Sequence, residues 1–231
     1  MSEPMRIALL GATGMIGRRV MEKCVGRSDV RLAALARREA ALSPGARMEM
    51  FVADPANWGE VFEAVRPRAA ICALGTTWKK SGADETAFRT VDYDLVLATA
   101  RAAKANGVER FVVVSSVGAA AGAKQFYLKV KGEMERDLAK VGFSRLDILR
   151  PGLLRGPRDN DRRPLERFGI MVGPAANLLL HGKYRAYRSI DARVVAQAAL
   201  ALCLRKAKGR FVHDNDGIVR AARELPELID A

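Results

Sequence analysis

The chain has 231 residues and a mass of 25.1 kDa, which suits one domain with a sizeable core. Hydrophobic residues make up 49% and charged residues 28%, so the composition excludes disordered, collagen-like and coiled-coil chains. The three cysteines stand in apolar surroundings without a C-x-x-C spacing, which argues against a disulfide framework and a zinc site. The N-terminal apolar run is too short for a signal peptide, and no run reaches the length of a membrane span. We therefore expect a cytoplasmic protein whose single domain covers residues 1–231.

The formal net charge is +13, and most of the excess lies in the C-terminal half, densest over residues 145–193. Such a field attracts anions, whether nucleic acid, lipid headgroups or an acidic substrate. The alternative is a solvated basic surface in an arginine-rich protein, and the spread of the charges favours it. Aromatic residues are only 6% and do not alternate with basic ones, so nucleic acid is not an expected partner.

Short apolar runs without polar alternation predict strands that are covered on both faces, and segments of helical periodicity separate them. In chain order we expect strand 6–10, helix 15–25, strand 30–36, strand 48–52, helix 58–65, strand 69–74, helix 84–106, strand 111–114, helix 129–141 and strand 146–149. This alternation predicts the α/β class, with six buried parallel strands in a Rossmann-like doubly wound sheet that carries helices on both faces.

Beyond Pro151 the pattern loosens into a loop punctuated by glycine and proline, before a helical stretch over 192–204. We interpret residues 151–188 as a small C-terminal substrate lobe. The apolar run 168–180 is too short to span a bilayer and is better suited to a pocket lid or to the contact of a homodimer.

A glycine-rich turn directly follows the first predicted strand and opens the first helix. Gly11, Gly14 and Gly17 permit the tight turn, the close approach of a pyrophosphate and the near contact of helix and strand. The sequence therefore predicts dinucleotide binding by a set that also includes the neighbours Ala12, Thr13, Met15, Ile16 and Arg18.

The residues after the second strand indicate which dinucleotide binds. An NAD site would place an acidic residue there to bind the ribose 2′-hydroxyl, but this chain has Arg37 and Arg38. Guanidinium groups form charge-assisted bonds to the 2′-phosphate of NADP, so NADP is favoured over NAD, although solvated arginines at a strand end remain the alternative. Asp54, after the third strand, is placed to accept from the adenine amino group.

Four further residues predict the chemistry of a carbonyl reduction. Ser115 and Ser116 end the fifth strand, and Tyr127 and Lys131 are one helical turn apart. A phenol is a poor acid at neutral pH unless an ammonium group stabilises the phenolate, and Lys131 supplies that charge. Either serine hydroxyl can bond the substrate oxygen, so the choice between them stays open.

Together, the glycine spacing, the paired serines, Tyr127-x-x-x-Lys131 and Arg150-Pro151-Gly152 resemble the short-chain dehydrogenase/reductase superfamily in its extended and atypical branches. The segments 72–77 and 127–133 look like the Tat-interacting-protein oxidoreductases. The resemblance covers about residues 6–200.

The resemblance implies a role for each matching residue. Tyr127 would be the general acid and base, Lys131 would bind the nicotinamide ribose, and Ser116 would orient the carbonyl, with Ser115 as the alternative. The residues that would line the nicotinamide and its ribose are Leu74, Gly75, Thr76, Pro151, Gly152, Leu153 and Leu154. The gap from Ser116 to Tyr127 is shorter than in many members, which leaves the serine assignment and the competence of the site open.

The function expected from these residues is an NADP(H)-dependent oxidoreductase that acts on a small carbonyl or alcohol. The alternative is a non-catalytic NADPH sensor that acts through a protein partner, and the presence of Tyr127 and Lys131 argues against it. No metal site is expected, because His181 and His213 lack carboxylate or cysteine neighbours at ligand spacing.

Overall fold

The computed structural model describes residues 3–39, 42, 45, 47–78, 81–156 and 181–226. Its main sheet contains seven parallel strands in the order β3-β2-β1-β4-β5-β6-β9. These strands are β1 (Met5–Leu10), β2 (Val30–Ala36), β3 (Met48–Val52), β4 (Ala69–Cys72), β5 (Arg110–Val114), β6 (Arg145–Leu149) and β9 (Gly209–His213). The strand order reverses between β1 and β4, which is the topological switch point of a doubly wound fold. The predicted Rossmann-like class is therefore confirmed.

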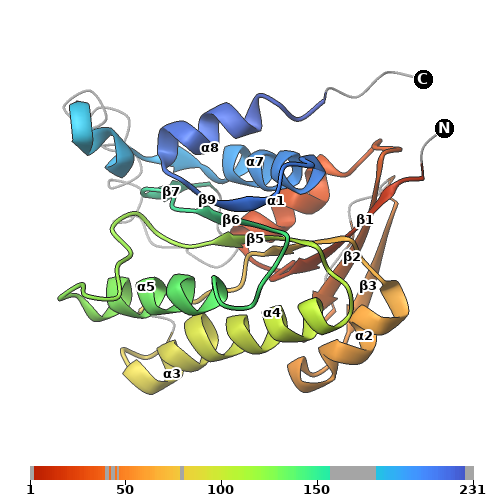
Figure 1. The fold of residues 1–231 in the computed structure, drawn as a ribbon, viewed down its shortest axis with the longest axis horizontal. Helices are drawn as coiled ribbons and strands as arrows, with labels where there is room; N and C mark the ends of the chain where they lie inside the picture. Colours follow the sequence, from red (N-terminus) through yellow and green to blue (C-terminus); the bar gives the residue numbers. More distant parts are fainter. Residues whose placement is uncertain are drawn as a thin grey trace.

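Helices cover both faces of this sheet (Figure 1). The core on one face includes residues of α1 (Met15–Lys23), α7 (Ala192–Leu204) and α8 (Asn215–Ala222). The other face is covered by α2 (Trp58–Val65), α4 (Leu95–Ala105) and α5 (Phe126–Leu138). Shorter elements are the 3-10 helices η1 (Pro55–Asn57) and η3 (Gly182–Tyr187), the helix α3 (Glu85–Arg89), the π-helical segment η2 (Thr90–Asp94) and the small parallel pair β7 (Leu154–Arg155) and β8 (Ile190–Asp191).

Local sequence explains where several helices begin. Asp84, Asp191 and Asp214 precede α3, α7 and α8, and each carboxylate accepts a hydrogen bond from a backbone N–H of the first turn. In contrast, the N-cap residue of α1 is Gly14, which has no side chain to cap the helix, and the first turn of α1 carries no acidic residue. The N–H groups at the start of α1 are therefore available to an anion.

Several boundaries differ from the sequence prediction. The edge strand β3 is only half-buried, so the prediction of six fully buried strands is wrong for it, and β9 is a seventh strand that the prediction missed. Strand β4 ends at Cys72 instead of residue 74. Helix α5 begins three residues earlier than predicted, which places Tyr127 in its first turn. The region 84–106 is helical as predicted, but it contains the π-helical segment η2.

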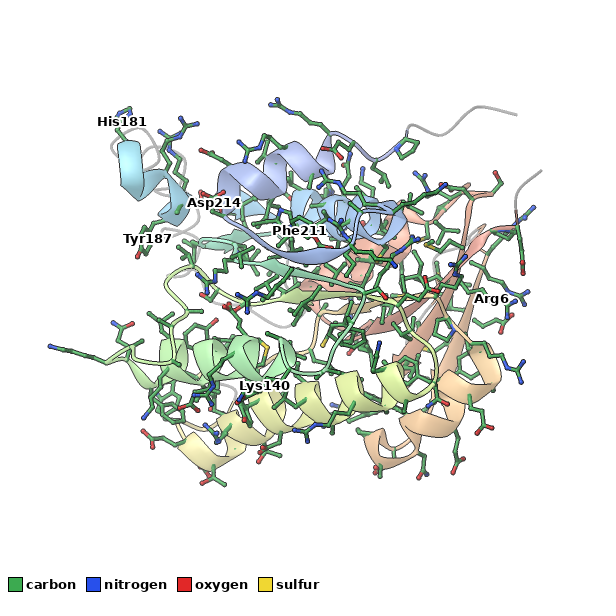
Figure 2. All side chains as sticks on the ribbon, in the orientation of Figure 1. Arg6, Lys140, His181, Tyr187, Phe211 and Asp214 are labelled. Atoms are coloured by element: carbon green, nitrogen blue, oxygen red, sulfur yellow. The ribbon has the colours of Figure 1, made fainter. Side chains whose placement is uncertain are left out.

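The carboxyl ends of the strands lie at one end of the molecule, together with the described residues of the predicted lobe, 151–156 and 181–188. Figure 2 shows Tyr187 and His181 there, far from Arg6 at the start of β1. The described part of the lobe is held to the start of α8 by Asn215, whose side chain accepts from the Gly152 N–H at 2.8 Å and donates to the Arg188 carbonyl. The predicted lid or dimer segment, residues 168–180, lies outside the described residues.

Candidate active site

The glycine-rich turn after β1 meets the loop after β4 at the switch point of the sheet. Gly11 has a φ of +82°, and a Cβ on it would lie 2.6 Å from the Ala73 carbonyl oxygen. A Cβ on Gly17 would lie 2.2 Å from the Gly11 oxygen. Both spaces are too small for any other residue, because real Cβ contacts of that length do not occur. The backbone turn and the start of α1 thus have the form that a dinucleotide pyrophosphate requires.

The side chains of the residues around these glycines differ in their exposure to solvent. Ala12 and Ile16 are buried in the core under α1, so only their backbone groups face the turn. Thr13 is exposed, and its carbonyl accepts from Arg18 Nε at 3.2 Å. Met15 is half-buried. The chain elements that a cofactor would meet here are therefore mainly backbone N–H groups and the arginine.

Arg37 and Arg38 are exposed and directly follow the carboxyl end of β2, next to the β1 turn in the strand order. Asp54 follows β3, and its carboxylate accepts from the Ala56 N–H at 2.9 Å, which caps η1. Asp54 is exposed. The adenine contact predicted for Asp54 stays a prediction.

On the other side of the switch point, α5 carries Tyr127 and Lys131 on one face. The Lys131 side chain is only 5% exposed, and its Nζ lies 2.7 Å from Oδ1 of Asp92, which is fully buried. Burial alone would lower the pKa of Lys131, but the Asp92 carboxylate, and after it the Tyr127 hydroxyl, raise that pKa above its ordinary value. Lys131 is therefore a charged ammonium group beside Tyr127 at neutral pH.

The loop after β4 lies against this ion pair. The Thr76 N–H donates to Asp92 Oδ2 at 2.8 Å, and a Cβ on Gly75 would lie 3.2 Å from Asp92 Oδ1 and 3.6 Å from Lys131 Nζ. Leu74, Gly75 and Thr76, predicted to line the nicotinamide ribose, are thus beside the predicted catalytic lysine. The sequence analysis missed Asp92, although an acidic residue on the buried stripe of a helix was a signal for it.

The two predicted serines have different surroundings. Ser115 is buried, and its hydroxyl donates to Glu135 Oε1 at 2.5 Å. Glu135 also accepts from Nε of Arg150 at 3.0 Å, so the Ser115 hydroxyl belongs to a network between β5, α5 and β6. Ser116 is half-buried, and its hydroxyl contacts the Val117 carbonyl at 3.3 Å. The Ser115 hydroxyl is thus held in a buried network, whereas Ser116 is partly exposed.

A close backbone contact explains the short gap between Ser116 and Tyr127. A Cβ on Gly132 of α5 would lie 2.1 Å from the Ala120 carbonyl carbon, so the connecting loop lies directly on the helix. An aromatic cluster packs at the start of α5, where the Tyr127 ring lies 5.4 Å from the ring of the buried Phe88. These contacts fix the first turn of α5 and with it the phenol.

The segment after β6 completes the same end of the sheet. Pro151 is buried, and its carbonyl accepts from the Val117 N–H at 3.0 Å. A Cβ on Gly152 would lie 2.3 Å from the Arg188 oxygen. Leu153 is 59% exposed, and Leu154 begins β7. Pro151 thus lies beside the loop that carries Ser116, and the predicted roles of these four residues stay predictions.

The switch point, the glycine-rich turn and the helix that carries Tyr127 and Lys131 define a protein with the fold of the short-chain dehydrogenases/reductases. The profile of a family described as NAD(P)H-binding matches residues 11–172, and the chain belongs to this family. The predicted class, an NAD(P)-dependent oxidoreductase of the short-chain dehydrogenase/reductase type, is thereby confirmed.

Among curated proteins the chain is similar to "Protein fmp52, mitochondrial" of Aspergillus clavatus, with 33% identity over 88% of each chain. It is also similar to "Protein FMP52, mitochondrial" of Eremothecium gossypii, with 34% identity over 90% of this chain and 93% of that protein. These relatives are named as mitochondrial proteins, which contradicts the expectation of a cytoplasmic location. Within the described residues, no helix combines the length and apolarity needed to cross a membrane.

Solved structures share the fold at low sequence identity. The complex of MoeE5 with UDP-glucose and NAD superposes with a TM-score of 0.68 and 18% identity, over 95% of this chain and 81% of MoeE5. The UDP-glucose 4-epimerase of Thermotoga maritima has a TM-score of 0.68 and 15% identity, over 95% and 82% of the two chains. Both solved chains are longer than this chain.

Proposed function

We propose that this protein is an NADP(H)-dependent oxidoreductase that moves a hydride to or from a small carbonyl or alcohol substrate, with Ser116, Tyr127 and Lys131 as the catalytic residues. The observation that carries the proposal is the buried, charged Lys131 one helical turn from Tyr127, at the carboxyl ends of β4 and β5 beside a glycine-rich turn. A proton donor, an ammonium group that would lower its pKa, and a candidate cofactor site thus lie close together.

The chain's residues supply the proton chemistry of this reaction. In the direction of reduction, the Tyr127 hydroxyl gives its proton to the carbonyl oxygen, and the Lys131 ammonium stabilises the phenolate that remains. The Ser116 hydroxyl donates to the same oxygen and orients it. NADPH, when bound, supplies the hydride that the carbonyl carbon receives. Solvent then returns a proton to Tyr127. The overall reaction converts the carbonyl, NADPH and one proton into the alcohol and NADP⁺.

Arg37 and Arg38 support NADP over NAD. Both are exposed and directly follow the carboxyl end of β2, where a ribose 2′-phosphate can accept from their guanidinium groups. The structural neighbour MoeE5, in contrast, is a complex with NAD. The two arginines are thus the feature of this chain that favours the phosphorylated cofactor.

Calorimetric titration with NADPH, NADP, NADH and NAD tests the cofactor. We expect tight binding of the phosphorylated pair, and Arg37→Glu should weaken it by about 10-fold to 100-fold, because a charge-assisted bond is replaced by repulsion. Arg101→Glu, a charge reversal on the exposed face of α4, is the matched control and should bind as the wild type does. Equal affinity for NAD and NADP would contradict the proposed preference.

Turnover tests the catalytic assignment. Tyr127→Phe keeps the ring that packs on Phe88 but removes the proton, so it should abolish reduction of a carbonyl panel while NADPH affinity stays unchanged. A wild-type protein that binds NADPH but turns over no member of the panel would favour the sensor hypothesis instead. The homodimer contact stays a prediction, because the apolar segment 168–180 lies outside the described residues.

A further inference from the structure

The chain contains two tryptophans, Trp58 and Trp78, whose surroundings differ. Trp58 is 2% exposed, and its indole N–H donates to the Ala53 carbonyl at 3.3 Å. Trp78 lies in the loop after β4 and is 41% exposed. An indole ring is a large apolar surface, so leaving it in water forgoes much hydrophobic free energy. Trp58 is thus part of the core, whereas the ring of Trp78 is available to a ligand.

Trp78 belongs to an aromatic cluster that includes the proposed catalytic tyrosine. The centre of its ring lies 6.2 Å from the ring centre of Phe88 and 5.7 Å from that of Phe126. Phe88 lies 5.4 Å from Tyr127 and is fully buried, while Phe126 and Tyr127 are half-buried. Trp78 is therefore the exposed member of the cluster, and one buried ring connects it to the phenol that would donate the proton.

The backbone around Trp78 is fixed on both sides. Two residues before it, the Thr76 N–H donates to Asp92 at 2.8 Å. After it, the Ser81 hydroxyl and the Ala83 N–H donate to the Trp78 carbonyl at 2.8 Å and 3.0 Å. These bonds and the ring contacts together define the position of the indole. A preformed position lowers the entropy cost of binding a ligand.

Exposed apolar side chains gather at this end of the sheet. In the described part of the chain six large apolar side chains are exposed, and three of them lie here: Trp78 after β4, Leu153 after β6 and Tyr187 at the end of η3. Figure 2 shows Tyr187 beside the loop that leaves β5, where its hydroxyl lies 3.7 Å from the place that a Cβ on Gly118 would take. Single exposed apolar residues are ordinary, but such a group is typical of a ligand-binding site.

We propose that Trp78 determines the substrate specificity of this site: its ring packs against an aromatic ring of the substrate, so the substrate class is an aromatic aldehyde or ketone and the corresponding alcohol. Aromatic rings pack in offset or edge-to-face geometry, which strengthens binding by about 2-fold to 10-fold beyond the effect of apolar area alone. The reaction itself rests on the proposed function. The ring contact is tested without turnover.

The first experiment follows the two indole N–H signals of the ¹⁵N-labelled full-length protein by NMR, assigned with Trp58→Phe. Benzamide, an unreactive aromatic amide, should shift the Trp78 signal saturably and leave the signal of the buried Trp58 unchanged. Cyclohexanecarboxamide has a similar size but no π system, so it should bind about 2-fold to 10-fold more weakly. Equal affinity for the two amides, or a Trp78 signal that benzamide does not move, would overturn the proposal.

Steady-state kinetics with benzaldehyde and cyclohexanecarbaldehyde test the specificity. Trp78→Ala should raise KM for benzaldehyde by about 10-fold and keep kcat within a few-fold of the wild type, because a binding contact is lost and the proton chemistry is not. KM for the saturated aldehyde should rise less. Trp78→Phe keeps a ring and should restore most of the preference. An equal rise of KM for both aldehydes would contradict an aromatic contact.

Val212→Ala is the matched control, because Val212 is a similarly exposed apolar residue on the edge strand β9. It should leave both KM values unchanged. Light scattering on the wild type and on Trp78→Ala tests a second copy of the chain as the occupant. A dimer that dissociates in the variant, together with no benzamide shift, would assign the ring to a subunit contact and overturn the proposal.

The two experiments separate this proposal from the proposed function. If the wild type reduces no carbonyl, the proposed function fails, and the benzamide titration still decides whether Trp78 binds an aromatic ring. If the wild type reduces both aldehydes and Trp78→Ala keeps the wild-type preference between them, the proposed function stands and the role of Trp78 is overturned.

Discussion

The two sides of the switch point are built by different physical means. The glycine-rich turn after β1 depends on backbone space, since a side chain at Gly11 or Gly17 would collide with main-chain atoms. The catalytic side, which carries Tyr127 and Lys131, depends on buried carboxylates whose partners come from distant parts of the chain. Asp92 pairs with Lys131, and Glu135 accepts a hydrogen bond from Ser115. A local backbone constraint leaves a recognisable sequence motif, whereas a long-range ion pair does not.

The largest effect that separates these two sides is expected for Gly17→Ala. Its Cβ would lie 2.2 Å from the Gly11 oxygen, so α1 must shift away from the turn, at a cost of about 3 kcal/mol or more in the free energy of unfolding. NADPH binding should be lost as well, because the shift moves the N–H groups that face the pyrophosphate. Chemical unfolding and calorimetry measure the two effects.

Gly59→Ala is the control for that change. Gly59 lies in α2, and a Cβ there would meet no atom within 4 Å. Alanine favours the helix over glycine by about 0.5–1 kcal/mol, so this variant should be neutral or more stable and should bind NADPH normally. If Gly17→Ala were tolerated equally well, the turn would not depend on backbone space and the comparison would be wrong.

The sequence predicted the backbone turn of the first side, and it missed the ion pair of the second. Gly11, Gly14 and Gly17 were identified because consecutive strand, turn and helix must all agree at that point. The helical spacing of Tyr127 and Lys131 predicts that they share one face of α5, but the spacing contains no information about the buried acid that pairs with the lysine. Such partners meet only when the chain folds, so local periodicity cannot specify them.

The fold shows the same division. The strands near the centre of the sheet were predicted closely because their apolar runs are covered on both faces. Strand β9 was missed because it forms an edge and its residues are mostly exposed or half-buried, which gives no continuous apolar run. The start of α5 was misplaced because Gln125 provides no capping hydrogen bond to mark it. Elements whose boundaries depend on tertiary contacts were thus the ones that sequence patterns did not locate.

A smaller effect distinguishes the two serines. Ser115→Ala removes a buried hydrogen bond to the Glu135 carboxylate and should cost about 1.5–3 kcal/mol of stability, with turnover within a few-fold of the wild type. Ser116→Ala should leave stability nearly unchanged but lower kcat by about 100-fold, because a donor to the substrate oxygen is lost. Thermal unfolding and steady-state kinetics on the same preparations check both. The reverse pattern would make Ser115 the catalytic serine.

The smallest effect concerns Cys72, which ends β4 where the two sides of the site meet. Burial raises the pKa of its thiol to about 11, although the Leu74 backbone and the Lys131 ammonium lower it in part. An unfolded thiol ionises near ~8.5, so the stability that the neutral native thiol contributes is present below that pH and is lost as the pH rises toward 11. Between pH 8 and 9.5, unfolding by urea should therefore show a loss of about 1 kcal/mol from this thiol.

Comparison of two variants isolates this thiol. Cys72→Ala should reduce the alkaline loss of stability by about 1 kcal/mol. Cys24→Ala should reduce it equally, because burial raises the pKa of Cys24, at the end of α1, to about 12 and keeps it neutral in the same pH window. An effect in Cys24→Ala without one in Cys72→Ala would show that the Lys131 ammonium lowers the native pKa of Cys72 to its unfolded value. The Lys131 ammonium would then act on the thiol at the end of β4, which lies beside the glycine-rich turn. The two sides of the site would be electrostatically coupled in this way.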